Sequence, residues 1–189
     1  MPERRAPIEL SGFKLADLEK MIEDRRLPPV DRWEPERCGH SGMRIARDGT
    51  WYHEGAPIRR PAMTRLFSTV LRREADGRHV LVTPVEKLDI EVECTAFRAV
   101  EMQHEGEGEE RRIAFRLDSG DAIILGPDHP LRLVGDSHGP SPRILVRHGL
   151  EAELSRSVYY ELAEMALSEN PKRPGVWSDG QFFALEEPE

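Results

Sequence analysis

Apolar side chains recur at every second position between Leu88 and His148, and this periodicity constrains the fold more than any other feature of the sequence. A period of two residues predicts strands with one buried face, because alternate side chains point to opposite faces of a sheet. The apolar positions are Leu88, Ile90, Val92 and Cys94; Ile113, Phe115 and Leu117; Ile123 and Leu125; Leu131 and Leu133; and Ile144 and Val146. Glycine, proline and aspartate separate these runs, so we expect about six strands joined by mostly antiparallel turns.

A four-residue spacing of apolar side chains follows this alternating region. The stripe consists of Leu150, Leu154, Val158, Leu162 and Met165. Spacing of this kind is typical of one face of a helix, so we expect a helix of about 150–167 that packs against the sheet. Residues 87–189 are therefore predicted to form a strand-rich second domain with a C-terminal helix.

Residues 37–86 are predicted to form a first domain from a hairpin, a helix and a strand. Asp48-Gly49 lies between two extended segments, and this dipeptide is the strongest short signal for a β-hairpin. Pro61 suits the first position of a helix of about 60–73. The apolar stripe of that helix is Met63, Leu66, Phe67, Val70 and Leu71. The fold class is therefore α+β with two domains.

The first 36 residues are expected to form a helix and a connector ahead of these domains. Ser11 can cap a helix that ends near residue 26. Pro28, Pro29 and Pro35 favour an extended connector over 27–37, because proline removes backbone donors and restricts the residue before it.

A weak internal repeat indicates a possible duplication of the two domains. Met63-Thr64-Arg65 resembles Leu154-Ser155-Arg156, and an Asp-Gly turn follows each predicted helix, at Asp76-Gly77 and Asp179-Gly180. The two helices would then be equivalent elements of related domains.

Charge and cysteine content limit the classes of function. A formal net charge of −8 argues against general binding to nucleic acid, because attraction to phosphates needs a basic surface. No stretch approaches the roughly 20 apolar residues of a membrane span, and no signal-peptide pattern opens the sequence. Two cysteines, Cys38 and Cys94, are read as free thiols. We expect a cytoplasmic protein without a membrane partner.

The sequence holds no complete catalytic or metal-binding motif. Cys38 and His40 could be metal ligands, but a zinc site usually needs four, and His53 and Cys94 are weak candidates for the others. Neither a nucleophile elbow nor a phosphate-binding glycine loop is present. We expect no metal and no other cofactor, and an enzymatic function is unsupported.

Arginines gather around the predicted helix of the first domain. Arg59 and Arg60 stand at its start, where the helix dipole makes a cation mildly unfavourable. An anion held there by the helix terminus and the arginine side chains would offset this. Residues 59–73 contain five arginines and no acidic residue. The alternative is a solvated surface paired with acidic neighbours.

Two tryptophans lie in the predicted hairpins near opposite ends of the chain. Trp51 and Trp177 could each fill the core, or they could stack on a planar ligand. If a cleft separates the two domains, one tryptophan could line it from each side.

Four segments, "MRIARDGTWYHEGAPI", "LFSTVLRRE", "LVTPVEK" and "GVWSDGQFF", resemble the bacterial family named domain of unknown function 1285. The resemblance spans about residues 28–184. It implies a cytoplasmic protein of two related α+β domains, the second superficially similar to pleckstrin-homology folds. It also implies a binding cleft between the domains for a nucleotide-like ligand, and a role in signal transduction without established catalysis.

The resemblance implies further site residues when its motifs are carried over. They are Arg44, Asp48 and Trp51 of the first hairpin, Arg72 and Arg73 of the helix, Glu86 and Lys87 of a turn between the domains, and Trp177 and Ser178 near the end of the chain. Together with Arg59 and Arg60, these residues form the predicted ligand site. Lys87 is expected either to bind the anion or to form a structural pair with Glu86.

The function expected from the sequence is therefore non-catalytic binding of a small anionic or nucleotide-like ligand in an interdomain cleft. An enzyme acting on a phosphorylated small molecule and a protein interaction module remain alternatives. Turnover of a nucleotide would favour the enzyme, and an exposed apolar patch on the second domain would favour the module.

Overall fold

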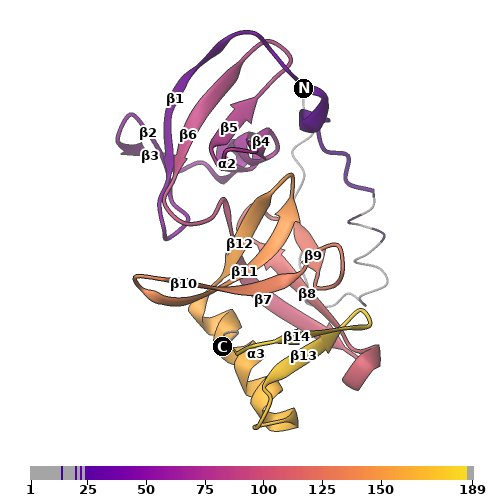
Figure 1. The fold of residues 1–189 in the computed structure, drawn as a ribbon. Helices are drawn as coiled ribbons and strands as arrows, with labels where there is room; N and C mark the ends of the chain where they lie inside the picture. The colour runs from indigo at the N-terminus through magenta and orange to yellow at the C-terminus, as the bar shows by residue number, and fades with distance from the viewer. Residues whose placement is uncertain (1–13, 15–19, 21, 23, 187–189) are drawn as a thin grey trace.

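Two six-stranded mixed sheets, built one after the other along the chain, make up most of the protein (Figure 1). The computed structural model describes residues 14, 20, 22 and 24–186. The expected helix over 11–26 falls largely outside the described residues. No helix in the described part of the chain is long and apolar enough to span a membrane.

The first sheet is formed by residues 38–92. Its elements are β1 (Cys38–Ile45), β2 (Trp51–His53), β3 (Ala56–Pro57), α2 (Pro61–Ser68), β4 (Leu71–Arg73), β5 (His79–Val82) and β6 (Lys87–Val92). The spatial order is β3-β2-β1-β6-β5-β4, and only the central pair β1–β6 is parallel. A short 3-10 helix, η1 (Val30–Arg32), precedes the sheet.

The second sheet follows directly and ends in a helix and a hairpin. Its elements are β7 (Phe97–Glu105), η2 (Gly108–Glu110), β8 (Arg112–Leu117), β9 (Ala122–Ile124), β10 (Leu131–Asp136), β11 (Gly139–Arg147) and β12 (Leu150–Leu154), followed by α3 (Arg156–Glu169), β13 (Gly175–Ser178) and β14 (Gln181–Ala184). The spatial order is β10-β11-β12-β7-β8-β9, and only the central pair β12–β7 is parallel. The expected strand-rich α+β domain with a C-terminal helix is confirmed.

The two sheets have the same topology, so the domains are related through their strands. In each, the first and sixth strands pair in parallel at the centre, and the remaining neighbours are antiparallel. The helices are not equivalent, however: α2 lies between the third and fourth strands of its sheet, whereas α3 follows the sixth. The predicted repeat therefore matched the wrong elements.

Both predicted helices are shorter than expected. The helix of 60–73 ends at Ser68, and Leu71–Arg73 form β4, where pairing with β5 outweighs the helical spacing. The helix of 150–167 begins only at Arg156. Ser155 is its N-cap, and the Ser155 hydroxyl accepts a hydrogen bond from the Val158 amide at 3.4 Å. Residues four apart lie on the same face of a strand as well as of a helix. The predicted stripe therefore combined Leu150 and Leu154 of β12 with Val158 and Leu162 of α3.

The first sheet extends past the expected domain boundary between Glu86 and Lys87. Strand β6 begins at Lys87 and pairs with β1 and β5, so the sheets divide after Val92. The turn over 83–86 joins β5 to β6 within the first domain, and the Thr83 amide donates to the Glu86 carbonyl at 2.9 Å. Residues 93–96 connect the domains instead.

One apolar core runs through both domains. Ile45, Trp51 and Leu71 of the first sheet belong to the same buried cluster as Phe97 and Ile144 of the second. Burial of apolar area against a second sheet stabilises both. On the other face of the first sheet, the connector is held by the buried contact of Val30 with Val80 and Val82.

Helix α3 provides a test of the core of the second domain. Val158 is 2% exposed, and Asp at this position would bury an unpaired charge. We expect Val158→Asp to lower the free energy of unfolding by at least about 3 kcal/mol in chemical denaturation. Tyr160, on the same helix, is 59% exposed. Tyr160→Asp is the matched control and should change stability by less than about 0.5 kcal/mol; equal losses in the two variants would contradict the packing of α3.

Candidate functional site

A pocket of about 300 Å³ lies between the two domains, where the β1–β2 turn and the start of α2 face the second sheet. We call it the interdomain pocket. Its lining from the first domain is Gly49, Thr50, Trp51, Ile58, Arg59, Pro61, Thr64 and Ser68, and its lining from the second is Ala96, Phe97, Asp118 and Ser119. The volume lies at the lower end of the range for small-molecule sites. Of the predicted site residues, the pocket brings together Trp51 and Arg59.

The Asp48-Gly49 turn shapes one wall of the interdomain pocket. The Asp48 carboxylate accepts the Thr50 amide at 2.9 Å, and this hydrogen bond lowers the pKa of Asp48. Gly49 has φ +89°, which favours glycine. A Cβ at position 49 would lie 2.9 Å from Oδ2 of Asp118. Glycine is thus required both for the turn and for the close approach of the domains.

The start of α2 and strand β2 supply the cation and one aromatic wall. Trp51 is 6% exposed and stacks on Phe67, with ring centroids 6.3 Å apart. Arg60 occupies the N-cap position without a side-chain capping bond, and Pro61 follows as the first helical residue. Arg59 lines the pocket and is exposed, and within the described residues it forms no ion pair. Arg60 is exposed beside it but does not line the pocket.

Asp118 brings a carboxyl group to the interdomain pocket from the end of β8. Its Oδ1 accepts the backbone amide of Arg98 at 3.1 Å. The residue remains accessible from the pocket, yet the surrounding protein removes much of the water around the carboxyl, and this burial raises the pKa of Asp118 to about 6. The next residue, Ser119, donates its hydroxyl to Asp121 at 3.0 Å.

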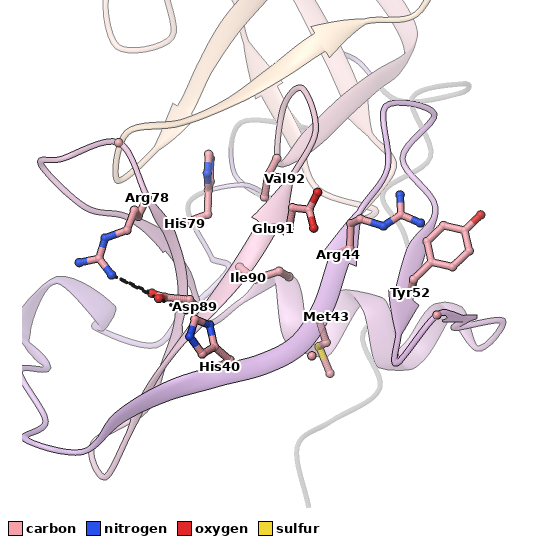
Figure 2. A pocket seen from close by; sticks show the side chains of 13 residues that line it. His40, Met43, Arg44, Tyr52, Arg78, His79, Asp89, Ile90, Glu91 and Val92 are labelled. Atoms are coloured by element: carbon pink, nitrogen blue, oxygen red, sulfur yellow. Dashed lines mark hydrogen bonds and ion pairs between the residues drawn. The ribbon is translucent and has the colours of Figure 1, made fainter.

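A second, larger pocket of about 650 Å³ lies on the first sheet, where β1 bulges between His40 and Arg44 (Figure 2). We call it the outer-face pocket. The Ser41 hydroxyl supports the bulge by donating to the Asp89 carbonyl at 2.8 Å. The walls of the outer-face pocket include Arg44 and Tyr52 on one side and Arg78 and Asp89 on the other.

The arginines of the outer-face pocket already have partners. Arg44 pairs with Glu93 and lies over the Tyr52 ring, with its guanidinium carbon 4.4 Å from the centroid. Arg78 contacts Asp89 at 3.1 Å, as Figure 2 shows. No three His, Cys, Asp or Glu side chains converge as metal ligands in the described part of the chain. The predicted residue Arg44 therefore lies in a different pocket from Trp51 and Arg59, and its charge is balanced there.

Arg72 is a structural residue that holds the connector on the first domain. It is 6% exposed, and its guanidinium donates to the carbonyls of Val30 at 2.7 Å and Trp33 at 2.9 Å. The same group contacts the Glu74 carboxylate at 2.9 Å. Arg73, the next predicted residue, is exposed, donates from Nε to the Gly77 carbonyl at 3.4 Å and lines neither pocket.

Lys87 and Glu86 lie within the first domain and not between the domains. Lys87 Nζ is 3.0 Å from Glu74 and 3.9 Å from Glu34, and hydrogen bonding to Glu74 raises the pKa of Lys87. Glu86 faces Arg37 at 3.7 Å. Lys87 therefore pairs with Glu74 and not with the expected partner Glu86, and neither residue lines the interdomain pocket.

Trp177 and Ser178 lie in the β13–β14 hairpin, which packs beside α3 on the part of the second domain remote from the first (Figure 1). Trp177 makes an edge contact with Phe182, with centroids 5.6 Å apart. Ser178 is fully buried, donates to the Leu125 carbonyl at 2.6 Å and accepts the Ile113 amide at 2.9 Å. The expected cleft lined by both Trp51 and Trp177 is therefore not formed.

Sequence reasoning missed the second domain's share of the interdomain pocket. Asp118 sits in an Asp-Ser-Gly turn between two predicted strands, and that turn signal could have drawn attention to it. Arg147 also went unnoticed. Its guanidinium donates to the Ser68 carbonyl at 3.1 Å and lies 4.9 Å from the centre of the Phe97 ring. Nothing in the local sequence distinguishes it from other arginines.

Known families and structures match this chain over most of its length. The matching families are "Domain of unknown function (DUF1285), N-terminal domain" over residues 28–95 and "Protein of unknown function (DUF1285), C-terminal domain" over residues 96–185. The crystal structure of a DUF1285 family protein from Silicibacter pomeroyi DSS-3 has 41% sequence identity and a TM-score of 0.79, and the match covers 93% of this chain and 96% of that one.

A second solved structure shares the fold at lower sequence identity. A DUF1285 family protein from Shewanella baltica OS155 is 21% identical, with a TM-score of 0.50, and the match covers 65% of this chain and 90% of that one. No protein of curated function matches the chain.

The structural role of Arg72 can be tested against its neighbour. Arg72→Met would leave two backbone carbonyls without their donor and would leave Glu74 with Lys87 alone, so we expect it to lower the free energy of unfolding by about 3–5 kcal/mol. Arg73→Met, one residue further along β4, should change stability by less than about 0.5 kcal/mol. Chemical denaturation measures both, and similar effects would contradict the assignment of Arg72.

The raised pKa of Asp118 predicts a pH-dependent contribution to stability. The native carboxyl binds its proton more tightly than the unfolded one, so its contribution to stability falls as pH rises from about 4 through about 6. We expect Asp118→Asn to be more stable than the parent near pH 7.5, by on the order of 1 kcal/mol because solvent screens the accessible carboxyl. The difference should vanish near pH 4 in chemical denaturation. A difference that is independent of pH would contradict the raised pKa.

Proposed function

The chain belongs to the DUF1285 family, and from its interdomain pocket we propose that it is a non-catalytic protein that binds a small anionic ligand with a planar ring, of which a nucleotide is an example. The ligand would contact both domains at once. A protein of two related domains that meet on one ligand is suited to a sensor or adaptor role, and we extend the proposal to signal transduction in the cytoplasm.

The observation that carries this proposal is the position of Arg59. Arg59 lines the interdomain pocket without an ion-pair partner among the described residues, in a chain with a net charge of −8. An arginine in such a position offers a planar set of donors for a phosphate or carboxylate. Arg44 and Arg72, by contrast, are neutralised by carboxylates.

The rest of the lining supports recognition of a ring. Trp51 and Phe97 come from different domains and both border the pocket. Both side chains are almost fully buried, at 6% and 1% exposed, so they give the pocket an apolar floor against which a ring can lie. Arg59 beside them can bind an anionic substituent of that ring. Thr50, Thr64 and Ser119 supply hydroxyl groups that can donate or accept hydrogen bonds.

An enzyme acting on a phosphorylated small molecule is the second candidate, and Asp118 is the observation in its favour. A carboxyl group with a pKa near 6 in a pocket could exchange a proton with a substrate near neutral pH. The lining supplies no histidine, cysteine or lysine that would act with it. Turnover of a nucleotide that Asp118→Asn abolishes would replace the binding proposal with this one.

The proposal is tested by the ligand dependence of thermal stability. Native mass spectrometry of freshly purified protein would first show any retained molecule, and thermal shifts would then be measured across a panel of nucleotides and inorganic pyrophosphate. Loss of one charged contact should weaken binding about tenfold or more in Arg59→Gln, so its ligand-induced shift should fall sharply.

Arg60→Gln is the matched control, because it removes the same charge from the adjacent exposed residue outside the pocket. Its ligand-induced shift should stay close to that of the parent. Equal ligand-induced shifts in the parent and Arg59→Gln would show that Arg59 does not bind the ligand, and would contradict the proposed site.

A further inference from the structure

Building on the proposed function, we infer that Asp118 determines which anions the interdomain pocket accepts: its ligand carries, besides the anionic group for Arg59, an amine or hydroxyl group that donates a hydrogen bond to the Asp118 carboxylate. The pocket is thus specific for a molecule that carries both an anionic group and a hydrogen-bond donor, such as a mononucleotide, over a simple polyanion.

The orientation of the Asp118 carboxyl group is fixed by its own domain. Oδ1 is anchored by the Arg98 amide at 3.1 Å, and the amide of Asp118 donates to the Arg98 carbonyl at 2.9 Å. These bonds place Oδ2 against Gly49 of the first domain, 2.9 Å from where a Cβ at that residue would stand. The carboxyl therefore lies at the junction of the two domains and borders the same pocket as Arg59.

The charged groups around Asp118 come from several elements. Arg98 on β7 favours the ionised carboxyl both through its positive charge and through its backbone amide. Arg59, just before α2, borders the same pocket, and Asp48 in the β1–β2 turn and Asp121 beyond Ser119 carry negative charge. Burial opposes ionisation but leaves the pKa near 6, so the carboxyl is mostly ionised above neutral pH.

An ionised carboxylate only accepts hydrogen bonds, and this property sets the chemistry of the ligand. A second anionic group placed beside it would be repelled by its negative charge. An amine or hydroxyl would instead form a charge-assisted hydrogen bond. A ligand with a ring in this pocket can carry both the donor for Asp118 and the anion for Arg59, whereas pyrophosphate can satisfy Arg59 alone.

The test compares two probes in one variant. Isothermal calorimetry would measure the binding of adenosine monophosphate and of inorganic pyrophosphate to the parent and to Asp118→Asn near pH 7.5. We expect Asp118→Asn to bind the nucleotide about tenfold more weakly, because it loses a charged acceptor, and to bind pyrophosphate as well as the parent or more tightly. Asp128→Asn makes the same charge change at an exposed residue outside the pocket and should alter neither affinity.

The pH dependence supplies a second readout. A cyclic mononucleotide keeps a single negative charge between pH 5 and pH 8, so a change in its affinity reports on the protein. Protonation of Asp118 removes the acceptor, so affinity should fall by about tenfold as the pH is lowered from 7.5 to 5, and this fall should be absent in Asp118→Asn.

The outcomes separate this inference from the proposed function. If Asp118→Asn changes both affinities in the same direction, or neither, while pyrophosphate binding still depends on Arg59, then Asp118 does not select the ligand. A rise in nucleotide affinity at low pH would also overturn the inference. If Arg59→Gln leaves pyrophosphate binding unchanged, or neither probe binds, the proposed function fails and the inference fails with it.

Discussion

The apolar core that the two sheets share holds the two domains together around the interdomain pocket. Trp51 and Leu71 belong to the first sheet and Phe97 and Ile144 to the second, yet all four lie in one buried cluster. A boundary of this kind resembles the interior of a single domain and strongly limits movement of one sheet against the other. At its edge, Arg147 of β11 donates to the last turn of α2 through Ser68, where a cation also complements the helix dipole.

The duplicated strand order does not by itself explain where the pocket forms. Each sheet places its first and sixth strands together in parallel at the centre. The second and third strands therefore lie beside the first, toward the edge that the third strand forms. The pocket is built from the β1–β2 turn of the first domain and the β8–β9 turn of the second, which carry Gly49 and Asp118. These turns occupy non-equivalent places in the two repeats. The site therefore arises from the packing of the domains and not from the repeat itself.

The sequence predicted features that depend on nearby residues. Alternation gave the strands of the second domain, and Asp48-Gly49 gave the first hairpin with Trp51 beside it. Arg59 was recognised because Pro61 marks the start of the helix. Arg72 could not be interpreted in this way, since its carbonyl partner Val30 is 42 residues distant. Asp118 was missed for the same reason: its importance comes from the approach of Gly49, which only the packing of the domains creates.

The connector adds a further constraint, because it is attached to both domains. Arg72 of the first domain holds it through the Val30 and Trp33 carbonyls, and Arg25, just before the connector, pairs with Asp121 of the second. Asp121 in turn accepts the hydroxyl of Ser119, which lines the interdomain pocket. A change in the angle between the domains would have to break these polar contacts as well as the shared core. A pocket held in this way is pre-organised, so a ligand that fits it loses little binding free energy to ordering the protein.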